Sequence, residues 1–167
     1  MSTSFPSGLK RSAAMIVLRH VDAFLLLHRN KPPHQGKYVP VGGKVEPYED
    51  PYSAAQRELT EETGLQLNQL QYCGVLIETS PTPYNWQCNI YLADIDDIIP
   101  PYCDEGTLEW IDFDEIDHIP TPPTDFQVYQ YIVQGRPFAL NAIYDGQLRL
   151  RKMTEEIAGE VVLDASL

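Results

Sequence analysis

The stretch GKVEPYEDPYSAAQRELTEETGL, residues 43–65, holds the most informative local pattern in the sequence. Asp50 suits the cap that begins a helix, and Pro51 suits the first helical position. Gly64 suits the left-handed residue that often ends one. An apolar stripe at helical spacing is formed by Tyr52, Ala54, Ala55 and Leu59. The stretch therefore predicts an amphipathic helix entered through a glycine-containing loop.

Three carboxylates gather in the last turns of this predicted helix. Glu58 precedes Glu61 by three residues and Glu62 by four, so all three project from roughly one side. Like charges at this spacing repel, and the negative end of the helix dipole adds a cost of about 0.3–1 kcal/mol for each carboxylate. A hard divalent cation would offset both costs. The alternative is an acidic face turned to solvent. Arg57 can orient a carboxylate or pair with Glu49.

The remaining segments predict strands around a second helix. Apolar runs over 12–20 and 22–30 predict a hairpin, and β-branched and aromatic residues over 70–79 and 86–95 predict a second antiparallel pair. Residues 30–44, rich in Pro, Gly and Lys, read as a loop. Further along we expect a strand over 107–113, a helical turn over 112–116 and a hairpin of 138–144 with 147–153 about Asp145-Gly146.

The second helix is expected within TPPTDFQVYQYIVQG, residues 121–135. Its cap would be Thr124 or Asp125 and its stop Gly135. Its apolar residues are Phe126, Tyr129 and Val133. The tail from Thr154 is expected to be a short helix or to be frayed.

This order of elements is not a regular alternation of strand and helix. It favours an α+β class, arranged as an α/β/α sandwich with a mixed β-sheet between helices. We expect residues 1–8 to form a flexible N-terminal tail and residues 9–167 to form a single domain.

The composition excludes several classes of partner. The formal net charge of the 167 residues is -12, which argues against nonspecific binding to nucleic acid or to an anionic membrane. A small phosphate compound remains compatible if a metal ion supplies positive charge. No apolar run is long enough to span a bilayer, and the N-terminus lacks the apolar run of a signal peptide. Three cysteines without a CxxC pair suggest free thiols. We therefore expect a cytoplasmic protein.

Residues 43–65 resemble the Nudix box, GX5EX7REUXEEXGU, where U is a bulky apolar residue. The matching positions are Gly43, Glu49, Arg57, Glu58, Leu59, Glu61, Glu62, Gly64 and Leu65. The resemblance implies the α/β/α fold of that family. It also implies hydrolysis of a diphosphate linkage in a nucleotide, with Mg²⁺ or Mn²⁺ as cofactor.

The resemblance also implies roles for the box residues. Metal ligands would be drawn from Gly43, Glu58, Glu61 and Glu62, and Arg57 would assist the glutamates. The general base varies within the family, so Glu58, Glu61 and a carboxylate outside the box are all candidates. The outside candidate is Glu105, in CDEGTLEW, with Asp104 and Glu109 as its competitors.

Residues outside the box bear on the identity of the substrate, and they point to more than one class. The frame GKYVPVGGKVE resembles the branch that removes oxidised purine nucleotides such as 8-oxo-dGTP. In that branch the loop before the last helix carries acidic residues and a Trp; here Asp125 lies in that loop, and a proline stands near the place of the Trp. Pro81 and Tyr84 point instead to ADP-ribose or nucleotide-sugar hydrolases and to dinucleoside polyphosphate hydrolases. Further candidates for substrate contact are Arg29, Lys44 and Glu46.

The resemblance leaves the activity and the oligomeric state to be considered. A Nudix module that binds nucleotides without catalysis is the alternative to an enzyme, although such members of the family commonly lose the box glutamates. Many members are homodimers, so a homodimer is compatible with the family, but the sequence shows no interface signal.

Overall fold

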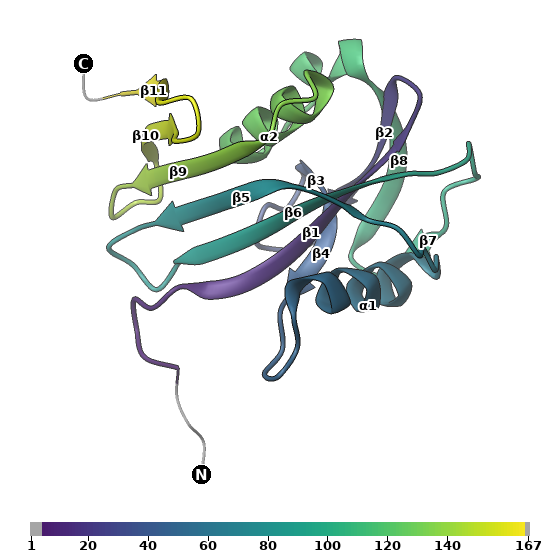
Figure 1. Ribbon diagram of the computed structural model, residues 1–167, viewed down its shortest axis with the longest axis horizontal. Coiled ribbons are helices and arrows are strands. Elements are labelled where there is room, and N and C mark those ends of the chain that lie inside the picture. The colour runs from purple at the N-terminus through teal and green to yellow at the C-terminus, as the bar shows by residue number, and fades with distance from the viewer. Residues whose placement is uncertain (1–4, 166–167) are drawn as a thin grey trace.

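The computed structural model describes residues 5–165 and has one twisted, mixed sheet with a helix on each face (Figure 1). The strands are β1 (Arg11–His20), β2 (Ala23–Arg29), β3 (Tyr38–Val39), β4 (Val41–Lys44), β5 (Gln71–Thr79), β6 (Trp86–Asp94), β7 (Tyr102–Cys103), β8 (Gly106–Asp112), β9 (Phe138–Tyr144), β10 (Leu150–Glu155) and β11 (Glu160–Asp164). The helices are α1 (Pro51–Thr63), the 3₁₀ turn η1 (Phe113–His118) and α2 (Pro123–Val133).

The strand order is β11-β10-β9-β5-β6-β1-β2-β8-β7. The β1–β6 and β5–β9 pairs are parallel, and the other neighbouring pairs are antiparallel. The predicted α+β sandwich with a mixed sheet is therefore confirmed. So are the two predicted antiparallel pairs, β1 with β2 and β5 with β6.

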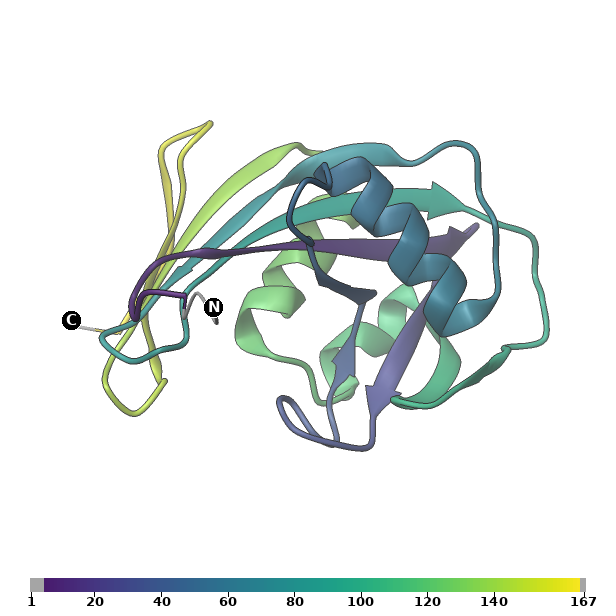
Figure 2. The ribbon, with the colours of Figure 1, turned by 90° about the horizontal axis from the view of Figure 1, so that it is seen from below.

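Alternate residues of the central strands bury opposite faces of the sheet. On β1, Ile16 and Leu18 pack in the cluster beneath α1, whereas Val17 packs in the cluster beneath α2. The two helices accordingly lie on opposite sides of the strands (Figure 2). Side chains buried on both faces explain why β1 and β2 read as continuous apolar runs.

Local signals position α1 as the sequence predicts. The Asp50 side chain accepts a hydrogen bond from the Ser53 amide at 2.9 Å, and Gly64 ends the helix with a φ of 75°. Ala55 and Leu59 are fully buried against the sheet. The register of α1 along the sheet, and hence the direction of its glutamates, is fixed by this buried stripe.

The sheet forks beside β1. Residues 13–16 of β1 pair with β4, whereas residues 18–20 pair with β2. The chain crosses between these partners within a few residues, because β3 pairs with β2 immediately before β4 pairs with β1. A Cβ on Gly42 would lie 2.3 Å from the Ala14 carbonyl oxygen, so a glycine is needed for this close approach.

Three sequence predictions are wrong. Residues 38–44 are not purely a loop, because β3 and β4 find partners on distant strands. The segment from Thr154 is not helical, because it completes β10 and pairs with β11. The α2 helix begins at Pro123 without a side-chain cap, because its N-cap residue is Pro122, whose side chain has no hydrogen-bonding atom; the Thr124 hydroxyl donates to the distant Glu78.

Other details of the second helix also differ from expectation. Tyr129 is fully buried as predicted, but Val133 is 40 % exposed. Residues 1–4 of the expected flexible tail lie outside the described residues, and residues 5–8 are exposed and form no helix or strand.

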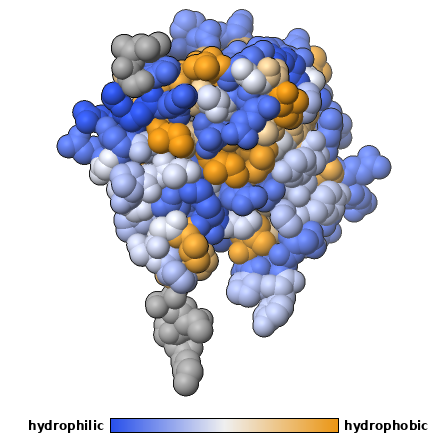
Figure 3. All heavy atoms as spheres, turned by 60° about the vertical axis from the view of Figure 1, so that its left-hand side comes forward, coloured by the Kyte–Doolittle hydropathy of each residue, from blue (hydrophilic) through white to orange (hydrophobic). Residues whose placement is uncertain are grey.

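The surface beside β9–β11 is mostly hydrophilic, with hydrophobic side chains in small separate groups (Figure 3). Among residues 5–165, no helix combines the length and apolar character needed to cross a bilayer. Cys73, Cys88 and Cys103 are free thiols, as expected.

Candidate active site

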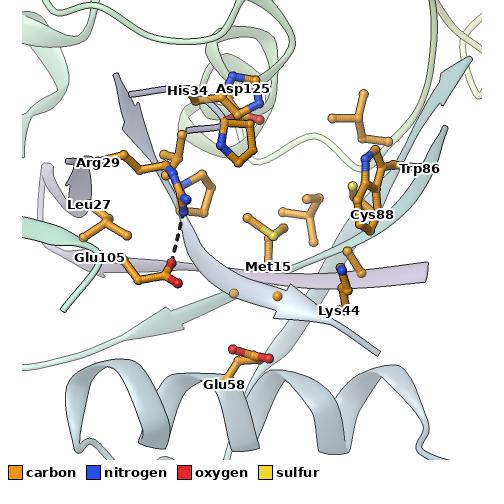
Figure 4. A pocket seen from close by; sticks show the side chains of 18 of the residues that line it. Met15, Leu27, Arg29, His34, Lys44, Glu58, Trp86, Cys88, Glu105 and Asp125 are labelled. Atoms are coloured by element: carbon orange, nitrogen blue, oxygen red, sulfur yellow. Dashed lines mark hydrogen bonds and ion pairs between the residues drawn. The ribbon is translucent and has the colours of Figure 1, made fainter. Parts of the chain in front are cut away.

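A pocket of about 500 Å³ opens where the sheet forks, with walls from α1, α2 and the strands between them. Glu58 of α1 faces it from one side, and Asp125 of α2 lies across it (Figure 4). Met15 of β1 lies between these two ends. The pocket therefore joins residues that are far apart in the sequence.

The α1 end of the pocket is acidic and crowded. A Cβ on Gly43 would lie 2.5 Å from Oε1 of Glu58, so the carboxylate lies directly against the glycine backbone. The Gly42 amide donates to Oε2 of Glu62 at 3.2 Å. Burial, followed by the charges of Glu105 and Glu58, raises the pKa of Glu62 to about 8.

Arg57 organises the carboxylates that surround it. Its guanidinium donates to both oxygens of Glu49 at 2.8 Å, to Glu58 at 2.9 Å and to Glu61 at 3.3 Å. It also donates to the Lys44 carbonyl oxygen at 3.1 Å. The pairing with Arg57 lowers the pKa of Glu49 to about 2. Arg57 thus ties the loop before α1 to the acidic face of the helix.

The donor set at this end fits a divalent cation. Glu58 and Glu62 are carboxylates, the ligands that Mg²⁺ and Mn²⁺ prefer, and burial raises the pKa of both. A cation would relieve this desolvation and repulsion. Among residues 5–165, no three Asp, Glu, His or Cys side chains form a ready-made cluster. Glu58 and Glu62 instead bond to Arg57 and to the Gly42 amide.

Glu105 reaches the same pocket from the loop between β7 and β8. Its Oε2 accepts from Nη1 of Arg29 at 3.1 Å, the ion pair drawn in Figure 4. Asp104, one competitor, is exposed, and Glu109 on β8 lies 3.6 Å from the His28 ring. Neither competitor lines the pocket, whereas Glu105 does.

The end near α2 combines aromatic rings with carboxyl groups. Tyr84 and Trp86 form part of the wall, with ring centroids 6.4 Å apart. Burial, and then the neighbouring charge of Glu78, raise the pKa of Asp125 to about 8. At neutral pH Asp125 therefore holds its proton most of the time.

Most of the residues predicted from the sequence are brought together here. The pocket is lined by Arg29, Gly43, Lys44, Glu58, Glu62, Tyr84, Glu105 and Asp125. Glu61 and Glu46 are outside the lining, with side chains 59 % and 63 % exposed, and both stand beside Arg57. Arg57 itself acts behind the pocket wall through its hydrogen bonds.

Three of the other wall residues have polar or aromatic side chains that sequence reasoning did not assign to the site. Trp86 is half-buried in the wall, although packing within its hairpin is the simpler expectation for such a residue. His34 faces the pocket from a loop where its own φ is 63°, which sequence does not reveal. Glu78 had a usable signal, since it follows Gly74 and Leu76 at the inward positions of β5.

Comparison with known proteins identifies the family of this chain. The model of the NUDIX domain matches residues 8–132, about three quarters of the chain. An uncharacterized Nudix hydrolase of Bacillus subtilis, YvcI, is 29 % identical over 125 residues, which cover 72 % of this chain and 77 % of that protein.

Solved structures show the same fold. The MutT protein of Bacillus halodurans has a TM-score of 0.77 at 22 % identity, covering 88 % of this chain and 98 % of its own. The NUDIX domain of Shewanella oneidensis NrtR, solved with ADP ribose, has a TM-score of 0.65 at 15 % identity, covering 76 % and 88 %. With the box residues placed as described, the chain belongs to the Nudix family of pyrophosphohydrolases, which generally use a divalent metal.

Proposed function

We propose that this chain hydrolyses a nucleoside triphosphate to a monophosphate and pyrophosphate, with Mg²⁺ or Mn²⁺ as its cofactor. The observation that carries the proposal is the two-ended pocket. Its α1 end has the carboxylates and cationic side chains that suit a metal-bound polyphosphate, and its α2 end has the rings and carboxyl groups that suit a base. A pocket of about 500 Å³ suits one small ligand.

In this proposal Glu58 and Glu62 hold the metal beside the Gly43 backbone, and Arg57 sets the orientation of Glu58. Glu61 is the weaker candidate for a ligand, because it is exposed. A divalent cation supplies positive charge that offsets the charge developing on the phosphate oxygens.

Arg29 and Lys44 are the phosphate-binding candidates on the pocket wall. Arg29 also holds Glu105, so the residue that would bind phosphate restrains the carboxylate that would take a proton from water. Glu58 and Glu61 remain the other candidates for this base. Glu46 is assigned no contact with substrate.

Within this activity, an oxidised purine such as 8-oxo-dGTP is the first substrate to test. Asp125 reaches the pocket, and the indole of Trp86 supplies an aromatic wall from β6 rather than from the loop before α2. The second candidate is cleavage of ADP-ribose, the ligand in the Shewanella structure. Of the sequence hints for other substrates, Tyr84 lies in the pocket wall and Pro81 is exposed.

The test is a turnover screen with Mg²⁺ over canonical and 8-oxo nucleoside triphosphates, ADP-ribose and diadenosine polyphosphates, with products identified by mass. Metal-dependent release of pyrophosphate from a triphosphate is the expected result. Preferred cleavage of ADP-ribose would replace the first candidate with the second. Absence of turnover for every compound would overturn the proposed activity.

A pair of variants separates the metal role from general charge effects. Glu62→Gln should abolish turnover, because an amide replaces a carboxylate at the metal. Glu115→Gln removes the same charge from the exposed turn η1 and should leave turnover unchanged. Full activity in Glu62→Gln would refute the assignment of Glu62.

A further inference from the structure

Glu78 is a buried acid in the pocket wall with no role in the proposed hydrolysis. Its side chain lies on β5 and the residue is only 4 % exposed. Its Oε1 accepts from the Thr124 hydroxyl at 3.1 Å and from the Tyr144 hydroxyl at 3.2 Å, and the Tyr84 hydroxyl also interacts with the carboxyl group. The carboxyl group is therefore held between α2 and β9 as a hydrogen-bond acceptor.

The surroundings of Glu78 provide no paired cation. Within residues 5–165, neither Glu78 nor Asp125 forms an ion pair with a Lys, Arg or His side chain. The positive charge of Lys37 acts on Asp125 only from a distance and lowers its pKa less than burial raises it. A buried acid without a cation is costly, so this end of the pocket favours a ligand that brings N–H donors.

Asp125 and Glu78 present different hydrogen-bonding groups to a ligand. Burial and the charge of Glu78 raise the pKa of Asp125 to about 8, so at neutral pH it can both donate and accept a hydrogen bond. Glu78 accepts from Thr124 and Tyr144 and is the acceptor of the pair. The pair thus offers a ligand two acceptors and one donor at the same end of the pocket.

The walls around these carboxyl groups suit a flat ring. Trp86 and Tyr84 contribute aromatic surface, and Leu76 and Ile90 contribute apolar surface. A planar heterocycle can stack on such a wall while its polar edge meets the carboxyl groups. Arg29, one phosphate-binding candidate, pairs with Glu105 and acts electrostatically on Glu62 at the acidic end, which orients a nucleotide with its base at Glu78.

We propose that Glu78, with Asp125, selects a nucleobase whose edge carries neighbouring N–H donors, as the ring N1–H and the 2-amino group of guanine do. This specificity role rests on the proposed nucleotide substrate. Adenine offers one amino group beside an acceptor nitrogen, and hypoxanthine lacks the 2-amino group. The 2-amino group is therefore the chemical feature that Glu78 recognises.

The experiment measures dissociation constants of GMP, IMP and AMP by ligand-observed NMR at neutral pH without metal. Loss of one hydrogen bond to a charged acceptor weakens binding by at least about tenfold. We expect GMP to bind at least about tenfold more tightly than IMP or AMP. In Glu78→Gln the GMP and IMP constants should converge, because the amide still accepts from Thr124 and Tyr144 but no longer carries the charge.

Controls separate recognition from structural support. Glu156→Gln removes an exposed charge close to the same sheet and should keep the preference for GMP. If the amide variant does not fold, Glu78→Met, which introduces an apolar side chain of similar length, is measured in its place. If Glu78 only supported the structure, its replacement would weaken the binding of all three ligands by the same factor.

Equal affinities in the wild-type chain, undetectable binding of GMP, or an unchanged preference in Glu78→Gln would each overturn the proposal. The result is independent of catalysis, because monophosphates are bound and not hydrolysed. A preference for GMP without turnover of any triphosphate would sustain the role of Glu78 and refute the proposed activity.

Discussion

Two adjacent glycines should respond to the same substitution in opposite ways. Gly43→Ala places a Cβ 2.5 Å from Oε1 of Glu58, the far end of a flexible side chain that can rotate aside. Gly42→Ala places its Cβ 2.3 Å from the Ala14 carbonyl and 2.7 Å from the Met15 Cα, both backbone atoms, at a φ of 152°. The first change should displace the Glu58 carboxylate, a proposed metal ligand, and the second should strain the β1–β4 pair.

The magnitudes follow from what must move. Displacing a carboxylate by about 1 Å costs on the order of 10²-fold in rate, so Gly43→Ala should lose about that much kcat. Its free energy of unfolding should change by less than about 1 kcal/mol, because no backbone atom has to shift. Gly42→Ala combines an unfavourable φ with a backbone clash, and backbone strain alone costs about 1–3 kcal/mol.

The assay pairs urea denaturation, followed by circular dichroism, with steady-state turnover of the substrate found in the screen. Binding of Mg²⁺ by calorimetry should weaken in Gly43→Ala, because Glu58 is a proposed ligand. Wild-type kcat in Gly43→Ala would refute the placement of Glu58 at the reacting centre. A loss of stability in Gly43→Ala equal to that in Gly42→Ala would refute the distinction between side-chain and backbone contacts.

Three more predictions concern other parts of the molecule. Glu105→Gln should lower kcat by about 10²–10⁴-fold with little change in KM, whereas Arg29→Gln should mainly raise KM; the reverse pattern in steady-state kinetics would exchange their proposed roles. The folded-state pKa of Asp125 is about 8 against an ordinary 3.8, so the unfolded chain loses this proton at lower pH than the folded protein does. The ionisation of Asp125 therefore lowers the free energy of unfolding progressively as pH rises from about 4 to 8. Urea denaturation at pH 5 and pH 8 should therefore show a smaller loss of stability in Asp125→Asn than in the wild type, and equal losses would contradict the raised pKa. Phe138→Ala, at a site 1 % exposed, should lower the free energy of unfolding by about 3–5 kcal/mol, and a change below 1 kcal/mol would contradict its place in the core.

The parts of the fold that sequence predicts are those with local causes. The ends of α1 follow from Asp50 and Gly64, whose capping geometry needs no distant partner. The long strands follow from apolar runs or alternation. In contrast, β4 forms by pairing with β1, which is distant in sequence, and the Thr124 hydroxyl, a candidate cap from the sequence, bonds instead to Glu78, 46 positions before it.

The candidate site divides in the same way. The spacing of Glu58 and Glu62 on a helix predicts that they share a face, so the acidic end is readable from one short segment. The other end is assembled from β5, β6 and α2, and only the fold brings Glu78 and Asp125 to one pocket. The signal for Glu78 in the sequence is its inward position in an alternating strand, where a polar residue stands in an apolar pattern.

The fork of the sheet at β1 separates the molecule into parts that can change independently. Residues 43–65 supply the acidic end, while positions 78, 84, 86 and 125 supply the other, and Met15 lies between them. A protein engineer could therefore randomise those four positions to alter base preference while leaving the helix that would carry the chemistry intact. The same separation offers natural selection a route to new substrates that does not require a new catalytic centre.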